Sequence, residues 1–246
     1  MGLTNRIQSI ALAMFASAAL WTGSAWAAPI YLDITNTTGT SGGWNMLGIT
    51  DSGASGAGGL GQTVANMIDT NSNSTGISAE ITERFNGLNS SGTSSPSGAA
   101  AEFGNHGADG GYGNFDAPFP GGNEVTIQNS QITFSNLIDT NTYDFTFFAS
   151  RLSVSDNRET LYELIGQNTD STTLNPSNNT SNVATVIGIS PDINGQIVLN
   201  ITEGANNTNG TGFYYLGALK IVAVPEPASI ALIGVGGLVV LTRRRR

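Results

Sequence analysis

The stretch YDFTFFASRLSVSDNRETLYELIG, residues 143–166, indicates the fold of this chain. Aromatic and apolar side chains occupy alternate positions over residues 143–149, and a second run of strand-forming residues spans 159–166. An alternation with a period of two residues is typical of a β-strand that buries one face. Asp156 and Asn157 are turn-forming residues between the two runs. We therefore expect two strands joined as a hairpin.

Similar short runs recur along most of the chain. Turn-forming glycine, proline, asparagine and serine separate them, and they span residues 29–35, 77–85, 125–137, 183–189, 195–202 and 212–224. No segment sustains the 3.6-residue period of an amphipathic helix. About eight short strands with glycine-rich connections predict an all-β fold, a two-sheet β-sandwich of the jelly-roll type. Residues 86–123 lack this periodicity and are predicted to form a long loop.

The first 27 residues have the features of a secretory signal peptide. Arg6 supplies a positive charge, residues 10–20 form an apolar segment, and Ala25 and Ala27 place small side chains beside a cleavage site. The apolar segment is shorter than the about 20 residues that a membrane-spanning helix needs. We expect cleavage after Ala27, which leaves a secreted ectodomain of residues 28–223.

The C-terminal residues 224–246 combine three features in a distinctive order. A Pro-Glu-Pro motif comes first, an apolar segment follows over residues 228–241, and four arginines end the chain. The residues of the motif and of the arginine cluster are Pro225, Glu226, Pro227, Arg243, Arg244, Arg245 and Arg246. A helix over the apolar segment would be about 21 Å long, whereas the hydrocarbon core of a bilayer is about 30 Å thick. The tail therefore predicts a transient membrane insertion and not a permanent anchor.

This order of motif, short apolar helix and arginine cluster resembles the PEP-CTERM sorting signal. The resemblance implies a substrate of exosortase, a membrane enzyme that recognises the motif and processes the tail. It also implies a secreted protein of the cell envelope or extracellular surface of a Gram-negative bacterium, produced together with exopolysaccharide.

The predicted ectodomain is strongly acidic. It holds 17 acidic and four basic residues, a net charge of −13. The basic residues are Arg84, Arg151, Arg158 and Lys220. Because a nucleic-acid-binding surface needs clustered basic side chains, we expect no nucleic-acid partner. The chain has no cysteine, so its stability must come from a core and not from disulfides.

Motifs for catalysis are weak in this sequence. His106 is the only histidine, no Gly-x-Ser-x-Gly motif is present, and no spacing singles out a pair of carboxylates. A single histidine in a glycine-rich loop is typical of an exposed surface residue. We therefore expect that the protein is not an enzyme, with a polysaccharide hydrolase as the alternative.

Two oxygen-rich loops have some features of calcium sites. Asp69 and Glu80 stand where an EF-hand loop has its first and last ligands, but the glycine lies at the wrong position, so we interpret this segment as a polar loop. Asp109 and Asp116 lie in a second loop, where carboxylates on a glycine-rich backbone suit Ca²⁺. We predict no required cofactor, with Ca²⁺ at Asp109 and Asp116 as the candidate metal.

Arg151 and Arg158 flank the turn within the opening stretch. A hairpin would bring them together on one rim, beside Asp156 and Glu159. Two interpretations stay open. In the first, the arginines hold sugar hydroxyls and the ring of Tyr162 stacks on the apolar face of a sugar. In the second, Arg151 forms a structural ion pair with Asp156 or Glu159.

The order of residues over 150–162, Ser-Arg, a short loop, Asn-Arg and a strand with tyrosine, occurs together with an opening segment GGWNML at 42–47. This pattern resembles β-sandwich modules related to galactose-binding and malectin-like domains, which implies a carbohydrate-binding role. We predict a protein associated with extracellular polysaccharide that contacts its ligand through Trp44, Arg151, Arg158 and Tyr162. The alternative is a structural or adhesive surface protein without a small ligand.

Overall fold

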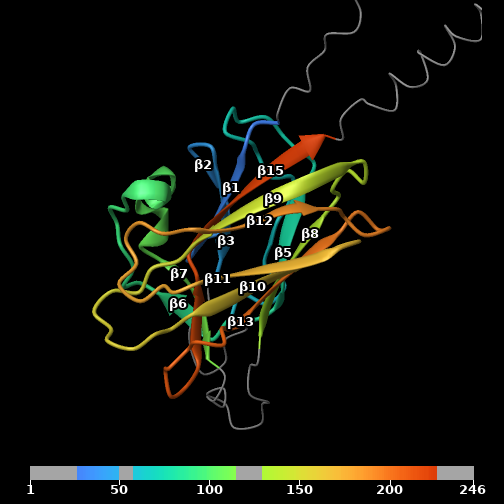
Figure 1. The fold of residues 1–246 in the computed structure, drawn as a ribbon. Helices are drawn as coiled ribbons and strands as arrows, with labels where there is room; N and C mark the ends of the chain where they lie inside the picture. Colours follow the sequence, from blue (N-terminus) through green and yellow to red (C-terminus); the bar gives the residue numbers. More distant parts are fainter. Residues whose placement is uncertain (1–26, 50–57, 115–128, 226–246) are drawn as a thin grey trace, which may run out of the picture. The chain divides into compact units, whose positions relative to one another are not determined.

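The computed structural model describes residues 27–49, 58–114 and 129–225 (Figure 1). Ala27–Val224 form one compact unit. Three predicted features lie outside the described residues. They are residues 1–26 of the signal peptide, which include Ala25, the candidate metal ligand Asp116, and the tail from Glu226 to Arg246.

The described residues form two six-stranded sheets and one three-stranded sheet. Sheet A has the order β12 (Ala184–Ile189), β9 (Asn141–Phe148), β15 (Ala218–Pro225), β1 (Ile30–Thr35), β3 (Trp44–Gly48) and β2 (Gly39–Ser41). Sheet B has the order β11 (Thr169–Leu174), β10 (Thr160–Ile165), β13 (Ile197–Glu203), β8 (Ser130–Ser135), β5 (Ser78–Glu83) and β4 (Thr63–Val64). The small sheet has the order β14 (Phe213–Leu216), β7 (Gly110–Asn114) and β6 (Gly87–Asn89).

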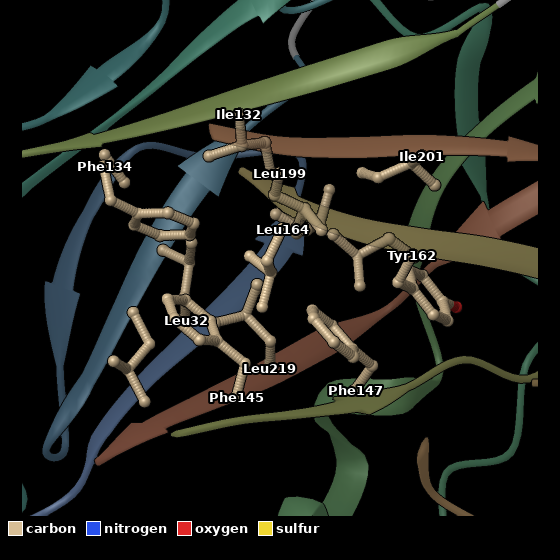
Figure 2. Packing of buried hydrophobic residues seen from close by; sticks show 14 of the residues in the cluster. Leu32, Ile132, Phe134, Phe145, Phe147, Tyr162, Leu164, Leu199, Ile201 and Leu219 are labelled. Atoms are coloured by element: carbon tan, nitrogen blue, oxygen red, sulfur yellow. The ribbon is translucent and has the colours of Figure 1, made fainter. Parts of the chain in front are cut away.

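The main core lies between sheets A and B, so the prediction of an all-β two-sheet sandwich is confirmed. Burial alternates residue by residue along β8, β10 and β13, as the period of two predicts. Figure 2 shows Phe145 and Phe147 of sheet A packed against apolar side chains of sheet B. The ring centroids of Phe134 and Phe145 are 5.4 Å apart, which is a favourable distance for an aromatic pair.

Strands β9 and β10 do not form the predicted hairpin. β9 belongs to sheet A and β10 to sheet B, so the connection over residues 149–159 crosses from one sheet to the other. Both strands bury an aromatic face in the same core, but they do so from opposite sides. Phe147 and Tyr162 stack across this core with ring centroids 4.5 Å apart.

The predicted long loop over residues 86–123 contains regular structure. It includes β6, a 3₁₀ helix η1 (Gly98–Gly107) and β7, followed by residues beyond Asn114 that are not described. Glycine is needed here because the backbone runs close to aromatic side chains. A Cβ atom on Gly111 would lie 2.6 Å from Phe85 Cδ1. Such strands carry few apolar side chains, which is why alternation does not reveal them.

The two ends of the compact unit lie at the same end of sheet A. β1 and β15 are antiparallel, and Ile30 near the start of the unit pairs with Ile221 near its end. β14 directly precedes β15 in the chain. The small sheet therefore lies next to the other end of β15, a strand of eight residues and a length of about 26 Å.

Candidate functional site

A pocket of about 350 Å³ lies where the small sheet meets the connection from β9 to β10. The 86–91 segment provides one side, β7 and β14 provide an aromatic side, and the β9–β10 connection provides two guanidinium groups. The lining residues are Leu88, Asn89, Ser90, Ser91, Tyr112, Arg151, Arg158, Phe213 and Tyr215.

Three aromatic rings from the small sheet form one side of the pocket. β14 pairs with β7 so that Tyr215 lies opposite Tyr112, and Phe213 lies two residues before Tyr215 on the same face. The centroid of Tyr112 is 5.7 Å from that of Phe213 and 6.3 Å from that of Tyr215. Tyr214 points to the opposite face, where its hydroxyl group lies 3.1 Å from Ser130 Oγ in the core. Because side chains alternate along β14, Phe213 and Tyr215 line the pocket, whereas Tyr214 lies on the opposite face in the core.

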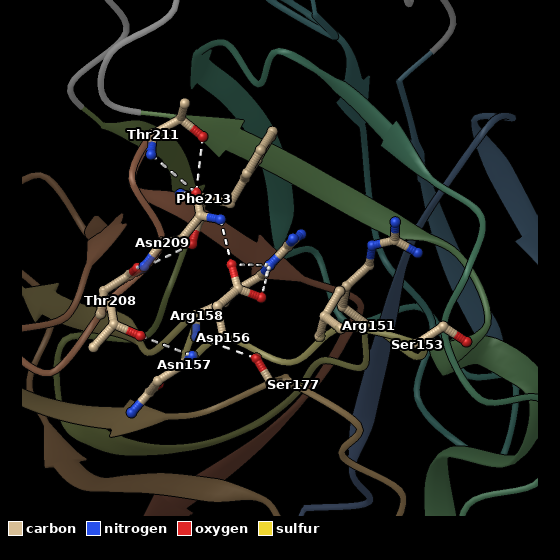
Figure 3. A network of polar contacts seen from close by, with 12 residues as sticks. Arg151, Ser153, Asp156, Asn157, Arg158, Ser177, Thr208, Asn209, Thr211 and Phe213 are labelled. Atoms are coloured by element: carbon tan, nitrogen blue, oxygen red, sulfur yellow. Dashed lines mark hydrogen bonds and ion pairs between the residues drawn. The ribbon is translucent and has the colours of Figure 1, made fainter.

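Polar and aromatic contacts fix the side chain of Arg158 (Figure 3). Its Nε donates to both oxygens of Asp156, at 3.1 and 3.2 Å, and its Nη1 donates to the hydroxyl group of Tyr215 at 2.5 Å. The guanidinium carbon lies 5.1 Å from the ring centroid of Phe213, within the range of a cation–π contact. Arg158 is therefore part of the pocket and also part of its framework.

Asp156 offsets the charge of Arg158. Asn209 Nδ2 donates a further hydrogen bond to the Asp156 carboxylate. This bond, and then the contact with Arg158, hold the pKa of Asp156 below its usual value. The predicted ion pair of Arg151 with Asp156 or Glu159 is wrong, because Asp156 pairs with Arg158 and Glu159 accepts from Asn206.

Arg151 enters the pocket from a well-anchored backbone. Its N–H donates to the carbonyl of Pro176 at 2.8 Å, and its own carbonyl accepts from Asn178 N at 2.8 Å. The side chain is half-buried, and its Nη1 makes a 3.4 Å contact with the carbonyl of Leu152. Within residues 27–49, 58–114 and 129–225, no carboxylate forms an ion pair with Arg151. Figure 3 shows its guanidinium apart from the pair of Asp156 and Arg158.

The two guanidinium groups both influence Tyr215. Burial raises the pKa of the Tyr215 hydroxyl group, and the positive charge and hydrogen bond of Arg158, followed by the positive charge of Arg151, partly oppose this rise. Arg151 and Arg158 therefore lie close together, as predicted. Their proximity results from the connection that crosses between the two sheets, and not from a hairpin.

The other two predicted contact residues are not in this pocket. Tyr162 is 0% exposed and donates a 2.6 Å hydrogen bond to the carbonyl of Tyr215. A ring with no exposed surface cannot stack on a sugar, so the predicted contact role of Tyr162 is corrected to a core role. Trp44 is half-buried on sheet A, with its ring centroid 4.7 Å from that of Tyr31. Trp44 is not among the residues that line the pocket.

Trp44 belongs to a second cluster, around η1. The ring of His106 stacks on Trp44 at 3.7 Å, and His106 Nδ1 lies 2.7 Å from Asp33 Oδ2. His106 is thus held in a partly buried stack, whereas the sequence predicted an exposed surface residue. Asp33 is 6% exposed. Burial raises its pKa to about 6, although the hydrogen bond with His106 opposes the rise.

The metal predictions have different outcomes. Asp69 Oδ1 accepts hydrogen bonds from the backbone N–H groups of Asn71 and Asn73, both at 2.8 Å, so this carboxylate caps its own loop as a polar loop requires. Asp109 follows η1, and the described parts of the chain contain no group of three acidic or histidine side chains that could hold a metal ion. The site at Asp109 and Asp116 stays a prediction, since Asp116 is not described.

Sequence reasoning missed the aromatic side of the pocket. Tyr112 lies in the predicted loop, and Phe213 and Tyr215 lie in the run of three aromatic residues at 213–215. The spacing of two residues within that run is the only sequence feature that could have indicated them.

Residues 223–246 match the family model of the PEP-CTERM protein-sorting motif. No curated protein and no solved structure matches the chain. The resemblance to galactose-binding and malectin-like domains is not confirmed, although the fold is a β-sandwich. Within the described residues, no helix has the length and apolar character needed to cross a membrane. The match at 223–246 confirms the predicted sorting signal, and it indicates a secreted bacterial cell-surface protein that exosortase processes.

Proposed function

We propose that this secreted protein is a non-enzymatic carbohydrate-binding protein that associates with extracellular polysaccharide, and that the pocket between the small sheet and the β9–β10 connection is its binding site. One observation carries the proposal: three aromatic rings and two arginines converge on a single open pocket. Aromatic faces stack on the apolar face of a sugar ring, and guanidinium groups donate to its oxygens.

The size and chemistry of the pocket support this proposal. A volume of about 350 Å³ is at the lower end of the range for ligand pockets, which suits one sugar ring better than several. The lining offers hydroxyl, amide, aromatic, aliphatic and guanidinium groups, all of which bind sugars. Glycoside hydrolysis instead uses a pair of carboxylates beside the substrate, so the lining is better suited to binding than to catalysis.

A structural or adhesive role without a ligand is the second candidate. It is favoured by Arg158, whose side chain is held by Asp156 and Tyr215 and so stabilises the connection between the sheets. Phe213 separates the two candidates, because its half-buried ring lines the pocket and its removal should leave that ion pair intact.

Binding of the Ala27–Val224 unit to extracellular polysaccharides tests the proposal. We expect the wild type to be retained on at least one polysaccharide, the Phe213→Ala variant to lose retention, and a Trp44→Ala variant to keep it. Trp44 is the matched control, as an aromatic side chain outside the pocket. Retention that survives Phe213→Ala and disappears with Trp44→Ala would overturn the assignment of the pocket. A folded wild type that binds no polysaccharide would favour the structural role.

A further inference from the structure

The charge balance of the pocket is uneven. Arg158 is neutralised by Asp156 at 3.1 Å, whereas Arg151 pairs with no carboxylate of the described residues. Neither aspartate nor glutamate is among the lining residues that the structure describes. The pocket therefore carries about one unit of positive charge in an ectodomain whose 17 acidic and four basic residues give it a net charge of −13.

The backbone of Arg151 is held in place by hydrogen bonds on both sides. Its backbone bonds to Pro176 and Asn178, and the next residue, Leu152, donates to the carbonyl of Ser91 at 2.8 Å. These bonds tie the arginine to the 86–91 side of the pocket. The anchored backbone places the Arg151 side chain at the pocket before binding, so that only the side chain has to be ordered by an anionic partner.

We infer that the pocket recognises a sugar that bears a carboxylate, that is, a uronic acid residue of a polysaccharide. The inference rests on the proposed function and names the substrate class of the same pocket. The sugar ring lies against the half-buried rings of Tyr112 and Phe213, and its carboxylate pairs with Arg151. Arg151 offers two parallel N–H groups, which match the two oxygens of a carboxylate.

The acidity of the rest of the ectodomain limits this recognition. A densely charged polyanion is repelled by a net charge of −13 over most of its length. A single uronic acid between neutral sugars avoids most of this repulsion. The pocket is therefore matched to a polysaccharide with sparse acidic residues.

Titration of the Ala27–Val224 unit with methyl glycosides at low ionic strength tests the inference. The probes are the methyl glycosides of glucuronic and galacturonic acid, the matching neutral glucoside and galactoside, and a sulfated galactoside. We expect one uronic acid to bind about tenfold or more tightly than its neutral counterpart, because a bidentate charge-assisted contact contributes that much. Arg151→Gln should abolish this preference, so that the uronic acid binds no more tightly than its neutral counterpart.

Lys220→Gln is the matched control. It removes the same unit of positive charge, but Lys220 pairs with Glu102 away from the pocket lining. The preference should survive in this variant, and an equal loss in both variants would show a general electrostatic effect and overturn the inference. Arg151→Lys keeps the charge without the two parallel donors and should retain only part of the preference. If Arg151→Gln does not fold, as judged by its melting temperature, Arg151→Lys decides the outcome.

The failures are distinguishable. Equal binding of uronic and neutral glycosides overturns the inference and leaves the proposed function intact. Preference for the sulfated galactoside over both uronic acids overturns it as well. Absence of binding to all the glycosides and to intact polysaccharides overturns both the inference and the proposed function.

Discussion

The hydroxyl group of Tyr162 donates a 2.6 Å hydrogen bond to the carbonyl of Tyr215 inside the core. Tyr162→Phe keeps the ring and its stack on Phe147 but leaves that carbonyl without this donor. We expect the free energy of unfolding to fall by about 1–2 kcal/mol, since an unsatisfied buried polar group costs about that much. Denaturant unfolding measures the change.

Tyr112→Phe is the control for this prediction, because it removes the same atom from a half-buried ring of the pocket. Its unfolding free energy should change by less than about 0.5 kcal/mol. A Tyr162→Phe variant that is as stable as the wild type, or that binds ligand less well while remaining equally stable, would contradict the core role of Tyr162.

Asp33 gives the protein a defined pH dependence. Burial raises its pKa from 3.8 to about 6 in the folded protein, against the opposing effect of His106, and Asp109 adds to the rise. A carboxyl group with a raised pKa contributes stability that is fully present below its unfolded pKa and is lost as the pH rises through its folded pKa. We therefore expect the stability of the wild type relative to Asp33→Asn to fall by about 1–3 kcal/mol between pH 4 and about pH 6.5.

Melting temperatures of both proteins across this pH range check the prediction. Asp69 and Asp192 have lowered pKa values, set first by hydrogen bonds from Asn73 and Gln196, respectively. Their contribution has the opposite sign and changes below about pH 4, and the comparison with Asp33→Asn cancels it. Parallel stability curves for the two proteins would show that Asp33 does not titrate in this range.

At the scale of single residues, the sequence predicted proximity better than it predicted roles. The spacing of Arg151 and Arg158 around a turn indicated that both reach one site. It did not reveal which arginine Asp156 would pair with, because that choice depends on the path of the crossing connection. The role of Tyr162 was also hidden, since alternation shows that a side chain shares a face with its neighbours but not whether that face is buried.

Among the elements, η1 depends on a glycine that allows close packing. A Cβ atom on Gly107 would lie 2.0 Å from Phe148 Cε1, and Phe148 is fully buried against Phe103. Gly107→Ala must displace this ring, so we expect a loss of about 1–3 kcal/mol and a decrease of roughly 3–10 °C in Tm.

Thermal unfolding measures this effect, with Gly210→Ala as the control. A Cβ atom on Gly210 has no other atom within 4 Å, so this variant should melt within about 2 °C of the wild type. If both variants melt alike, Phe148 adjusts freely and η1 is not packed as the structure shows.

Glycine content also explains which strands the sequence could predict. Strands such as β8 and β13 alternate apolar and polar residues, so the period of two predicted them. β7 has the sequence GGYGN, with one apolar side chain, and its pairing with β14 comes from backbone hydrogen bonds. The hairpin prediction was wrong for β9 and β10 because a local pattern does not distinguish a turn within one sheet from a crossing between two.

At the scale of the whole Ala27–Val224 unit, the chain ends and the pocket have defined positions along β15. The first and last residues of the Ala27–Val224 unit lie near the paired residues Ile30 and Ile221. The small sheet, which contributes to the pocket, lies next to the other end of β15. The pocket and the two ends of this unit therefore lie at opposite ends of β15.

The last prediction concerns the fate of the full chain in a bacterium that has exosortase. The motif match at 223–246 implies processing, so we expect the mature secreted protein to lack Arg246. Replacing Pro225, Glu226 and Pro227 by alanine should abolish recognition, and the chain should then accumulate in the membrane fraction with Arg246 still present. Fractionation with mass spectrometry of the C-terminal peptide measures both results.

The variant Phe213→Ala is the control, because it changes the pocket and not the motif, and it should be processed like the wild type. Secretion of intact wild-type chains that end in Arg246, or equal processing of the alanine variant, would contradict this account of the tail.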